Sequence, residues 1–308
     1  MTAAFVLPET AALLAGLAAQ EGPHLADMTA ADMRATYRQL GALFDVAAEA
    51  GVRTVDFAGA GCALRAYFPG PAKAGPVILY LHGGGWVIGD LETHNPVCSL
   101  IAAVTGCRVV AVDYRLAPEH AFPAAHDDCL AAAHFVRASP PELEAPVTGL
   151  AVAGDSAGGN LAFDLSRRLG AGGVVAQLLI YPLVDCTSPA QGSYAEFATG
   201  YILDRKLMDR FIADYLPGDG DAAGIEASPE RHPLSADLPP TLVVTAGLDP
   251  LRDQGRALAA ALTTLGVETH LIEARGLIHG MATMRAALPS ADAILRRALR
   301  LFADILHS

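Results

Sequence analysis

The feature that most constrains the fold is an alternation, through the later part of the chain, between short apolar runs and longer stretches with helical periodicity. Several of the short runs are continuously apolar, which is typical of strands covered on both faces. The helical stretches lie at 96–105, 124–138, 157–169, 252–265 and 291–306. Alternation of this kind predicts an α/β fold with a mainly parallel sheet and helices on both of its faces.

Eight short segments are predicted strands, and with 308 residues the chain can build one large α/β domain or two small ones. A content of 52% hydrophobic and 18% charged residues is typical of a folded protein. The predicted strands lie at 53–57, 64–68, 77–81, 108–112, 150–153, 177–181, 241–246 and 269–273.

Two segments depart from the alternation. Residues 1–50 predict two helices: Pro8 opens the first, and Thr29 caps the second, in which apolar side chains recur at helical spacing. Residues 187–239 form a strandless insertion with one predicted helix at 207–215, and the apolar side chains on one face of that helix either pack on the main domain or line a pocket.

The net charge of −12 disfavours nucleic acids and anionic membranes as partners, because both repel an acidic surface. No segment approaches the roughly 18 apolar residues of a membrane span. The apolar run at 11–19 has no basic residue before it and follows Pro8-Glu9, so a helix is predicted there rather than a signal peptide. Five widely spaced cysteines without a C-x-x-C motif predict reduced thiols in a cytoplasmic protein.

The segment GDSAGGN at 154–160 fits the pattern Gly-x-Ser-x-Gly, with Ser156 at its centre. It follows a predicted strand and opens a predicted helix, which is the context of a strained turn that exposes a nucleophilic serine. Gly154 and Gly158 are small enough to let that turn form. Because a serine hydroxyl attacks only when a base removes its proton, the sequence must also supply a base and an acid that orients it.

The segment HGGGW at 82–86 follows another predicted strand and predicts a loop whose backbone N–H groups stabilise a developing oxyanion. The donors expected from it are Gly84 and Gly85, with Gly83 as the neighbouring alternative because the register is open by one residue. The N–H of Ala157, directly after the serine, is the third expected donor.

In this arrangement the partners follow in the chain order serine, acid, histidine. Asp249 comes at the end of the predicted strand 241–246 and is the candidate acid, whereas its competitor Asp253 falls within the next predicted helix. His279 lies between glycines just after the last predicted strand and is the candidate base, whereas His82 is interpreted as a structural residue of the glycine loop. No H-E-x-x-H motif or compact histidine–carboxylate cluster indicates a metal site, and no nucleotide loop is found, so no cofactor is expected.

With these motifs the chain resembles the hormone-sensitive-lipase-related carboxylesterases, the bacterial family IV of lipolytic enzymes. The resemblance spans most of the chain and implies an α/β-hydrolase fold whose mostly parallel, eight-stranded sheet carries a helical cap. It also implies hydrolysis of esters with short to medium acyl chains without a cofactor. The matching segments are HGGGWVIGD (82–90), DYRLAPEHAFPAA (113–125), GDSAGGN (154–160), DPLRDQG (249–255) and HG (279–280).

Under this resemblance, 1–50 and 187–239 form the cap, and 51–186 with 240–308 form the catalytic domain. Ser156, Asp249 and His279 are then the triad. Candidates for contact with a small-molecule ester are Trp86, Asp155, Tyr201, Leu207, Met208, Phe211 and Met281.

The chain departs from the commonest family pattern at two positions. Gln254 stands where a glutamate often follows DPLRD, a change that can weaken a contact behind the active site. Met281 stands where a phenylalanine often follows the histidine, a change that can reshape the rim of the substrate pocket.

Two other functions remain open at this point. An amide-directed hydrolase, such as an arylformamidase or a deacetylase, can use the same triad, because both reactions pass through similar tetrahedral intermediates. A receptor-like protein that binds a ligand without turnover is disfavoured because His279 is present. The sequence leaves the oligomeric state open, and a homodimer is compatible with the resemblance.

Overall fold

The eight predicted strands form one sheet in a computed structural model that describes residues 4–187, 191–216, 218 and 221–307. The strand order is β1-β2-β4-β3-β5-β6-β7-β8. Only β2 runs against the others: it pairs antiparallel with β1 and β4, and all remaining pairs are parallel. The bounds are β1 Arg53–Gly59, β2 Cys62–Phe68, β3 Gly75–Leu81, β4 Arg108–Asp113, β5 Val147–Asp155, β6 Ala176–Ile180, β7 Thr241–Leu248 and β8 Thr269–Ile278.

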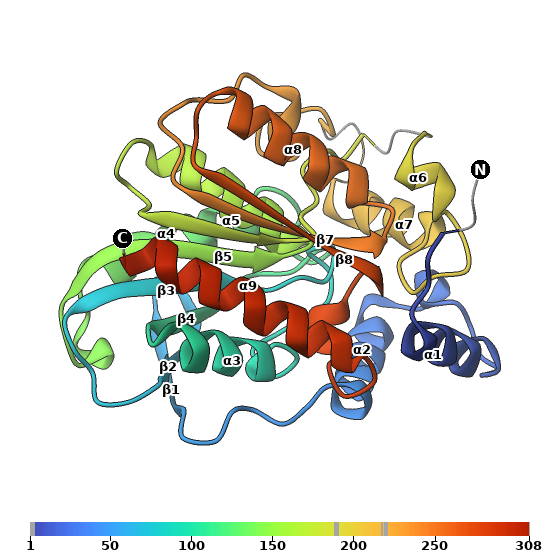
Figure 1. The fold of residues 1–308 in the computed structure, drawn as a ribbon, viewed down its shortest axis with the longest axis horizontal. Coiled ribbons are helices and arrows are strands. Elements are labelled where there is room, and N and C mark those ends of the chain that lie inside the picture. Colours follow the sequence, from blue (N-terminus) through green and yellow to red (C-terminus); the bar gives the residue numbers. More distant parts are fainter. Residues whose placement is uncertain (1–3, 188–190, 217, 219–220, 308) are drawn as a thin grey trace.

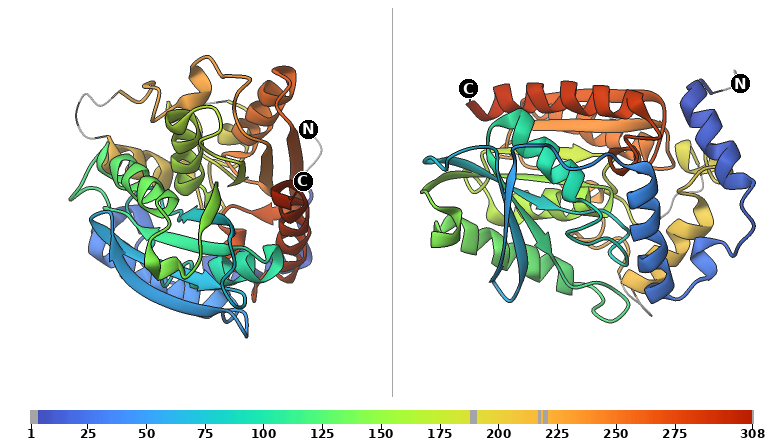
Figure 2. Two further views of the ribbon diagram at one scale, coloured as in Figure 1. Left: turned by 90° about the vertical axis from the view of Figure 1, so that its left-hand side faces the viewer. Right: turned by 90° about the horizontal axis from the view of Figure 1, so that it is seen from below.

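Helices cover both faces of this sheet, as the alternation predicts (Figure 2). Successive residues of β3 show the two layers: Leu79 packs into a core with α4, α5 and α8, and Tyr80 packs into a second core with α3 and α9. The helices are α1 Pro8–Ala18, α2 Ala30–Phe44, α3 Asn95–Thr105, α4 Ala124–Arg137, α5 Ala157–Leu169, α6 Ser193–Glu196, α7 Arg205–Tyr215, α8 Arg252–Thr264 and α9 Pro289–His307. The predicted α/β-hydrolase fold is therefore confirmed.

The N-terminal helices and α7 lie together at one end of the sheet (Figures 1 and 2). Thr29 caps α2, since its hydroxyl accepts a hydrogen bond from the N–H of Asp32. The short 3₁₀ turn Leu25–Asp27 packs beside α7, where Arg210 donates to the carbonyl oxygens of Ala26 and Met28. The described parts of residues 1–50 and of the insertion thus lie side by side, although residues 51–186 separate them in the chain.

Two predicted elements have different ends in the structure. Helix α7 begins at Arg205 rather than 207, because the carboxylate of Asp204 accepts a hydrogen bond from the N–H of Leu207 and caps the helix. Strand β8 continues five residues past 273 to Ile278, through Gly276 with φ +81°, next to a register shift against β7. In the described part of 191–239 there is no strand, as predicted. None of the helices in the described ranges is long and apolar enough to cross a lipid bilayer.

Candidate active site

Ser156 occupies a sharp turn between β5 and α5. Its backbone has φ 56° and ψ −121°, a conformation that non-glycine residues rarely adopt. The turn is tight: a Cβ atom on Gly154 would lie 2.1 Å from the carbonyl oxygen of Gly158. The N–H of Ser156 donates to the carbonyl of Ile180 on the neighbouring strand, 2.9 Å away, and this bond anchors the strained residue to the sheet. The Ser156 side chain is thereby held at the carboxyl end of β5, half-exposed.

His279 and Asp249 meet Ser156 from the ends of the last two strands. His279 follows β8, and its Nε2 atom lies 2.9 Å from Ser156 Oγ. Its Nδ1 atom lies 2.8 Å from Asp249 Oδ2, at the end of β7. The other carboxylate oxygen of Asp249 accepts a hydrogen bond from the N–H of Leu251 at 2.8 Å, so the buried carboxylate is held in one orientation. The competing Asp253 lies in α8, where its carboxylate accepts from Arg252 and the N–H of Ser193.

The glycine loop after β3 presents unpaired backbone donors. Gly84, Gly85 and Trp86 have φ values of 118°, 58° and 60°, so three successive residues adopt left-handed conformations. A Cβ atom on Gly84 would lie 2.2 Å from the carbonyl oxygen of Ile88, so no other residue fits there. Among the described residues, no hydrogen-bond acceptor is found for the N–H groups of Gly84, Gly85 and Ala157. These three residues line the same cavity as Ser156, and their N–H groups are available to a ligand oxygen.

The N–H of Gly83, the neighbouring alternative in this loop, has a partner. It donates to Asp155 Oδ1 at 2.8 Å and is therefore already occupied. Gly83 holds the loop in place, and the available donors are those of Gly84 and Gly85.

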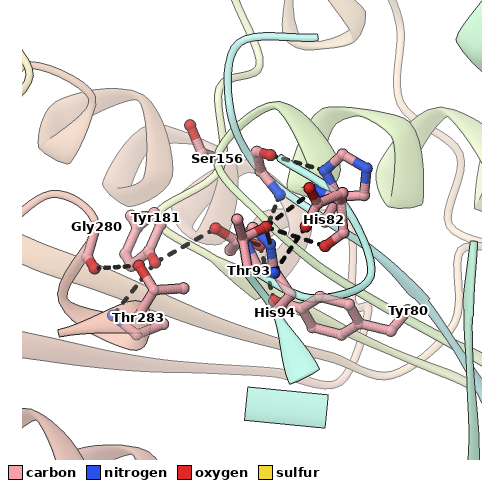
Figure 3. Close-up of polar contacts among 12 residues, drawn as sticks. Tyr80, His82, Thr93, His94, Ser156, Tyr181, Gly280 and Thr283 are labelled. Carbon is pink, nitrogen blue, oxygen red and sulfur yellow. Dashed lines mark hydrogen bonds and ion pairs between the residues drawn. The ribbon is translucent and has the colours of Figure 1, made fainter. Parts of the chain in front are cut away.

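Asp155 lies at the centre of a buried polar network beneath the loop. Its Oδ1 atom also accepts from Tyr80 Oη at 2.7 Å and lies 3.3 Å from His94 Nε2. Burial acts to raise the pKa of Asp155, but the adjacent His94 and the hydrogen bonds from Tyr80 and Gly83 outweigh burial and lower the pKa to about 2. The Tyr80 and His94 rings lie close together, with centroids 6.1 Å apart (Figure 3). Asp155 is therefore ionised throughout the neutral range.

His82 has the structural position that the sequence predicts. It is buried, stacks on Tyr114 with ring centroids 4.2 Å apart, and its Nδ1 atom lies 2.8 Å from the carbonyl oxygen of Gly83. Burial, followed by the nearby His94, lowers the pKa of His82 to about 4. His82 is thus a neutral side chain that supports the loop (Figure 3).

A cavity of about 90 Å³ opens over Ser156 and His279 and is lined mainly by apolar side chains. Five of the seven substrate candidates line this cavity: Trp86, Asp155, Leu207, Met208 and Phe211. The phenyl ring of Phe211 lies against the glycine loop, since a Cβ atom on Gly85 would come within 2.3 Å of it. Side chains that the sequence analysis did not single out complete the wall: Leu25, Tyr37, Leu40, Ile88, Leu183, Ile202, Leu203, Thr283 and Met284.

The other two candidates lie away from this cavity. Met281 is fully buried in the core beside α9, because a left-handed turn at Gly280 and a short 3₁₀ turn bring Thr283 and Met284 to the cavity instead. Tyr201 packs edge-on against Phe197, with ring centroids 5.2 Å apart, and the cavity is lined by the two residues that follow it. Met281 therefore cannot shape the rim as a residue in contact with substrate.

Gln254 makes more contacts than its departure from the family pattern suggests. Its side-chain oxygen accepts from the N–H groups of Val184 and Asp185, at 2.9 and 3.0 Å, and its amide nitrogen donates to the carbonyl of Asp185 at 3.0 Å. A carboxylate cannot donate the third of these bonds. Gln254 thus supports the loop that brings Leu183 to the cavity.

No group of three or more His, Cys, Asp or Glu side chains suited to a metal ion is found within the residues that the structure describes.

Comparisons with known proteins agree with this geometry. The Abhydrolase_3 family, described as alpha/beta hydrolase fold, matches residues 78–283. Carboxylesterase NlhH from Mycobacterium tuberculosis is 40% identical over 255 residues, which cover 80% of this chain and 79% of that protein. Ethyl acetate hydrolase from Pseudomonas putida is 37% identical over 72% of this chain and 71% of its own length.

Solved structures extend the likeness to nearly the whole chain. A crystal structure of a variant of LAE6, an α/β hydrolase from the metagenome of Lake Arreo, superposes with a TM-score of 0.92 at 35% identity and covers 99% of both chains. The chain therefore belongs to the hormone-sensitive-lipase-related carboxylesterases, within the α/β-hydrolase superfamily.

Proposed function

We propose that this protein is a serine carboxylesterase that hydrolyses short- to medium-chain esters through an acyl-enzyme. The observation that carries the proposal is the continuous chain from Ser156 Oγ through His279 to Asp249, with separations of 2.9 and 2.8 Å, beside three unpaired backbone N–H groups. A nucleophile, a base oriented by a carboxylate and an oxyanion site are the parts that acyl transfer requires.

In the first half-reaction, Ser156 Oγ attacks the ester carbonyl carbon while His279 Nε2 accepts the hydroxyl proton. The negative charge on the carbonyl oxygen is stabilised by the N–H groups of Gly84, Gly85 and Ala157. When the intermediate collapses, the C–O bond to the alcohol breaks, and His279 returns the proton to the leaving alkoxide. Asp249 keeps the imidazole in the tautomer that accepts at Nε2 and stabilises its charged form.

In the second half-reaction, water attacks the acyl-enzyme and His279 accepts a proton from it. The same three N–H groups stabilise the second tetrahedral intermediate. Its collapse breaks the bond between the acyl carbon and Ser156 Oγ, and the proton on His279 passes to the serine oxygen. The carboxylic acid leaves, and no cofactor takes part.

The small cavity favours short acyl groups. Its volume of about 90 Å³ and its apolar wall, which includes Leu207, Met208 and Phe211, suit a few methylene groups better than a long chain. The Pseudomonas putida relative is named ethyl acetate hydrolase, which supports the same size class.

We further propose that residues 1–50 and 187–239 act together as a cap. Support comes from the cavity wall, to which α2 contributes Tyr37 and Leu40 and α7 contributes Met208 and Phe211. Hydrogen bonds join the two segments: His24 Nε2 lies 2.9 Å from Asp204 Oδ2, at the start of α7. Substrate preference should therefore depend on this layer more than on the triad.

The proposal is tested with purified protein and 4-nitrophenyl acetate. Ser156→Ala should abolish turnover, whereas Ser166→Ala on the same helix should retain it, since the Ser166 hydroxyl only donates to the carbonyl of Ala162. A fluorophosphonate should label wild type on the peptide that carries Ser156. If Ser156→Ala keeps most of the activity, the proposal is wrong. A matched 4-nitroanilide compared with the ester separates amide-directed hydrolysis from ester hydrolysis.

A further inference from the structure

A further buried histidine–carboxylate pair, besides His94–Asp155, lies outside the proposed triad. His126 Nδ1, in α4, lies 2.7 Å from Asp164 Oδ2 in α5, and His126 Nε2 lies 2.6 Å from the hydroxyl of Tyr215. All three side chains are at most 2% exposed. No substrate reaches them, so this group cannot itself act as a nucleophile and base.

Tyr215 is the last residue of α7 and is held at three points. Its hydroxyl is in the network with His126, its carbonyl accepts from the N–H of Phe122 at 3.0 Å, and its ring meets the ring of Phe122 edge-on. Burial raises the pKa of Tyr215 far above its ordinary value, so the hydroxyl keeps its proton and can donate it to His126 Nε2. With the ring proton of His126 on Nδ1, each group then has a partner, and Asp164 accepts at the end of the chain.

The Tyr215 ring also stacks on the Trp86 ring, with centroids 3.9 Å apart and planes 7° from parallel. Trp86 directly follows Gly85 and has φ 60°, an outlier for a bulky side chain. Its indole N–H has no partner among the described residues, so hydrogen bonding does not fix this side chain. Packing against Tyr215, together with a bond from the N–H of Ala117 to the Trp86 carbonyl, holds the strained residue.

We propose that Tyr215 is a positioning residue for the oxyanion site. The His126–Asp164 pair fixes the Tyr215 ring, the ring fixes Trp86, and Trp86 fixes the backbone that aims the N–H groups of Gly84 and Gly85 at the developing oxyanion. Helix α7 then has two functions: one face lines the cavity, and its last residue keeps the glycine loop in the productive conformation. This inference rests on the proposed esterase function.

The chain offers a direct probe, because Trp86 is its only tryptophan. Intrinsic fluorescence therefore reports the loop without labelling. Acrylamide quenching measures how often the indole is exposed, and time-resolved anisotropy measures its local motion. A residue with a merely structural role changes the melting temperature but leaves turnover per folded molecule and the indole motion unchanged.

The test compares Tyr215→Leu and Tyr215→Phe with wild type. In Tyr215→Leu we expect kcat for 4-nitrophenyl acetate to fall about tenfold or more, since losing an oxyanion donor outright costs roughly 10²–10³. KM should change less than about twofold, and quenching of Trp86 should increase. Tyr215→Phe keeps the ring that stacks on Trp86 but leaves His126 Nε2 without a partner. Its kcat should therefore lie between those of wild type and Tyr215→Leu. Because this variant keeps the ring, it decides the question if Tyr215→Leu does not fold.

The matched control is Tyr67→Phe in β2, which removes another buried hydroxyl from the core on the α3–α9 face of the sheet. It should leave both kcat and Trp86 quenching at wild-type values. A trifluoromethyl ketone inhibitor mimics the tetrahedral intermediate and therefore reports on the oxyanion site. Its inhibition constant should rise in Tyr215→Leu by the same factor by which kcat/KM falls.

Two results would overturn the inference: Trp86 mobilised with kcat unchanged, or a loss confined to KM. If the proposed esterase function is wrong, the pattern is different: wild type shows no turnover, or Ser156→Ala turns over the ester as fast as wild type.

Discussion

Asp155 Oδ1 accepts a hydrogen bond from the N–H of Gly83 at 2.8 Å, so the residue directly before Ser156 holds the glycine loop that stands opposite it. The two glycine motifs of the sequence are thus joined by a buried carboxylate. This bond occupies the N–H of Gly83, whereas no partner is found among the described residues for the N–H groups of Gly84 and Gly85.

The first prediction concerns acid stability. The pKa of Asp155 is lowered from 3.8 to about 2, so its ionised form stabilises the fold fully above about 4, and this contribution is lost as the pH falls toward 2. A shift of this size corresponds to roughly 2 kcal/mol. Asp155→Asn should therefore be less stable than wild type at pH 7, and the difference should shrink between pH 4 and pH 2. Urea unfolding across this range measures it, and a constant difference would contradict the prediction.

The second prediction separates the two aspartates that compete for the acid's role. Asp249→Asn should lower kcat by roughly 10³–10⁴, because an amide at this position favours the wrong tautomer of His279. Asp253→Asn, four residues on, should keep activity within a few-fold, since its partners are Arg252, Arg256 and the N–H of Ser193. Equal losses in the two variants, at equal folded fractions, would contradict the assignment.

The sequence can bring Ser156, Asp249 and His279 together because their positions follow from the order of the strands. Ser156, Asp249 and His279 each follow a run that reads as a buried strand, and parallel strands bring their carboxyl ends to one edge of the sheet. The end of β8 is the weak point of this prediction. Gly276 suggests a break after 273, whereas the strand passes through it in a left-handed conformation and ends directly before His279.

The cavity wall is much harder to predict. Tyr37 and Leu40 are recognisable as apolar positions of the second helix, but periodicity does not show what such a face packs against. Met281 is expected at the pocket rim because it stands where a phenylalanine often follows the histidine in the family. Gly280 is left-handed and begins a short 3₁₀ turn. The Met281 side chain therefore lies in the core, although Met281 is close to His279 in the sequence. The contact between α7 and Trp86 depends on packing between distant segments, which no local pattern encodes.

A third prediction concerns Glu230, which lies within the insertion 187–239 and donates its N–H to the carbonyl of Val184. Burial, followed by the charge of Asp185, raises the pKa of Glu230 from 4.5 to about 7. Because this pKa is raised, the protonated form is the one that the fold favours, and stability is lost as the pH rises through about 7.

Glu230→Gln should therefore raise the melting temperature at pH 8 and leave it nearly unchanged at pH 4.5. Glu268→Gln, at a side chain that is 56% exposed, is the control and should not show this dependence on pH. A lower melting temperature for Glu230→Gln at pH 8 would contradict the prediction.

The last prediction concerns acyl length. Met208 reaches the cavity from α7 and is 3% exposed, so Met208→Ala should lengthen the space available to the acyl chain. The ratio of kcat/KM for 4-nitrophenyl octanoate to that for the acetate should rise about tenfold or more, since each methylene that a pocket accepts is worth roughly 1–3 kcal/mol. Met281→Ala removes an equal volume from the adjacent core and should cost about 2–5 kcal/mol of stability while leaving the ratio unchanged. A rise of the same size in both variants would mean that general loosening of the fold, and not the wall formed by α7, sets the acyl preference.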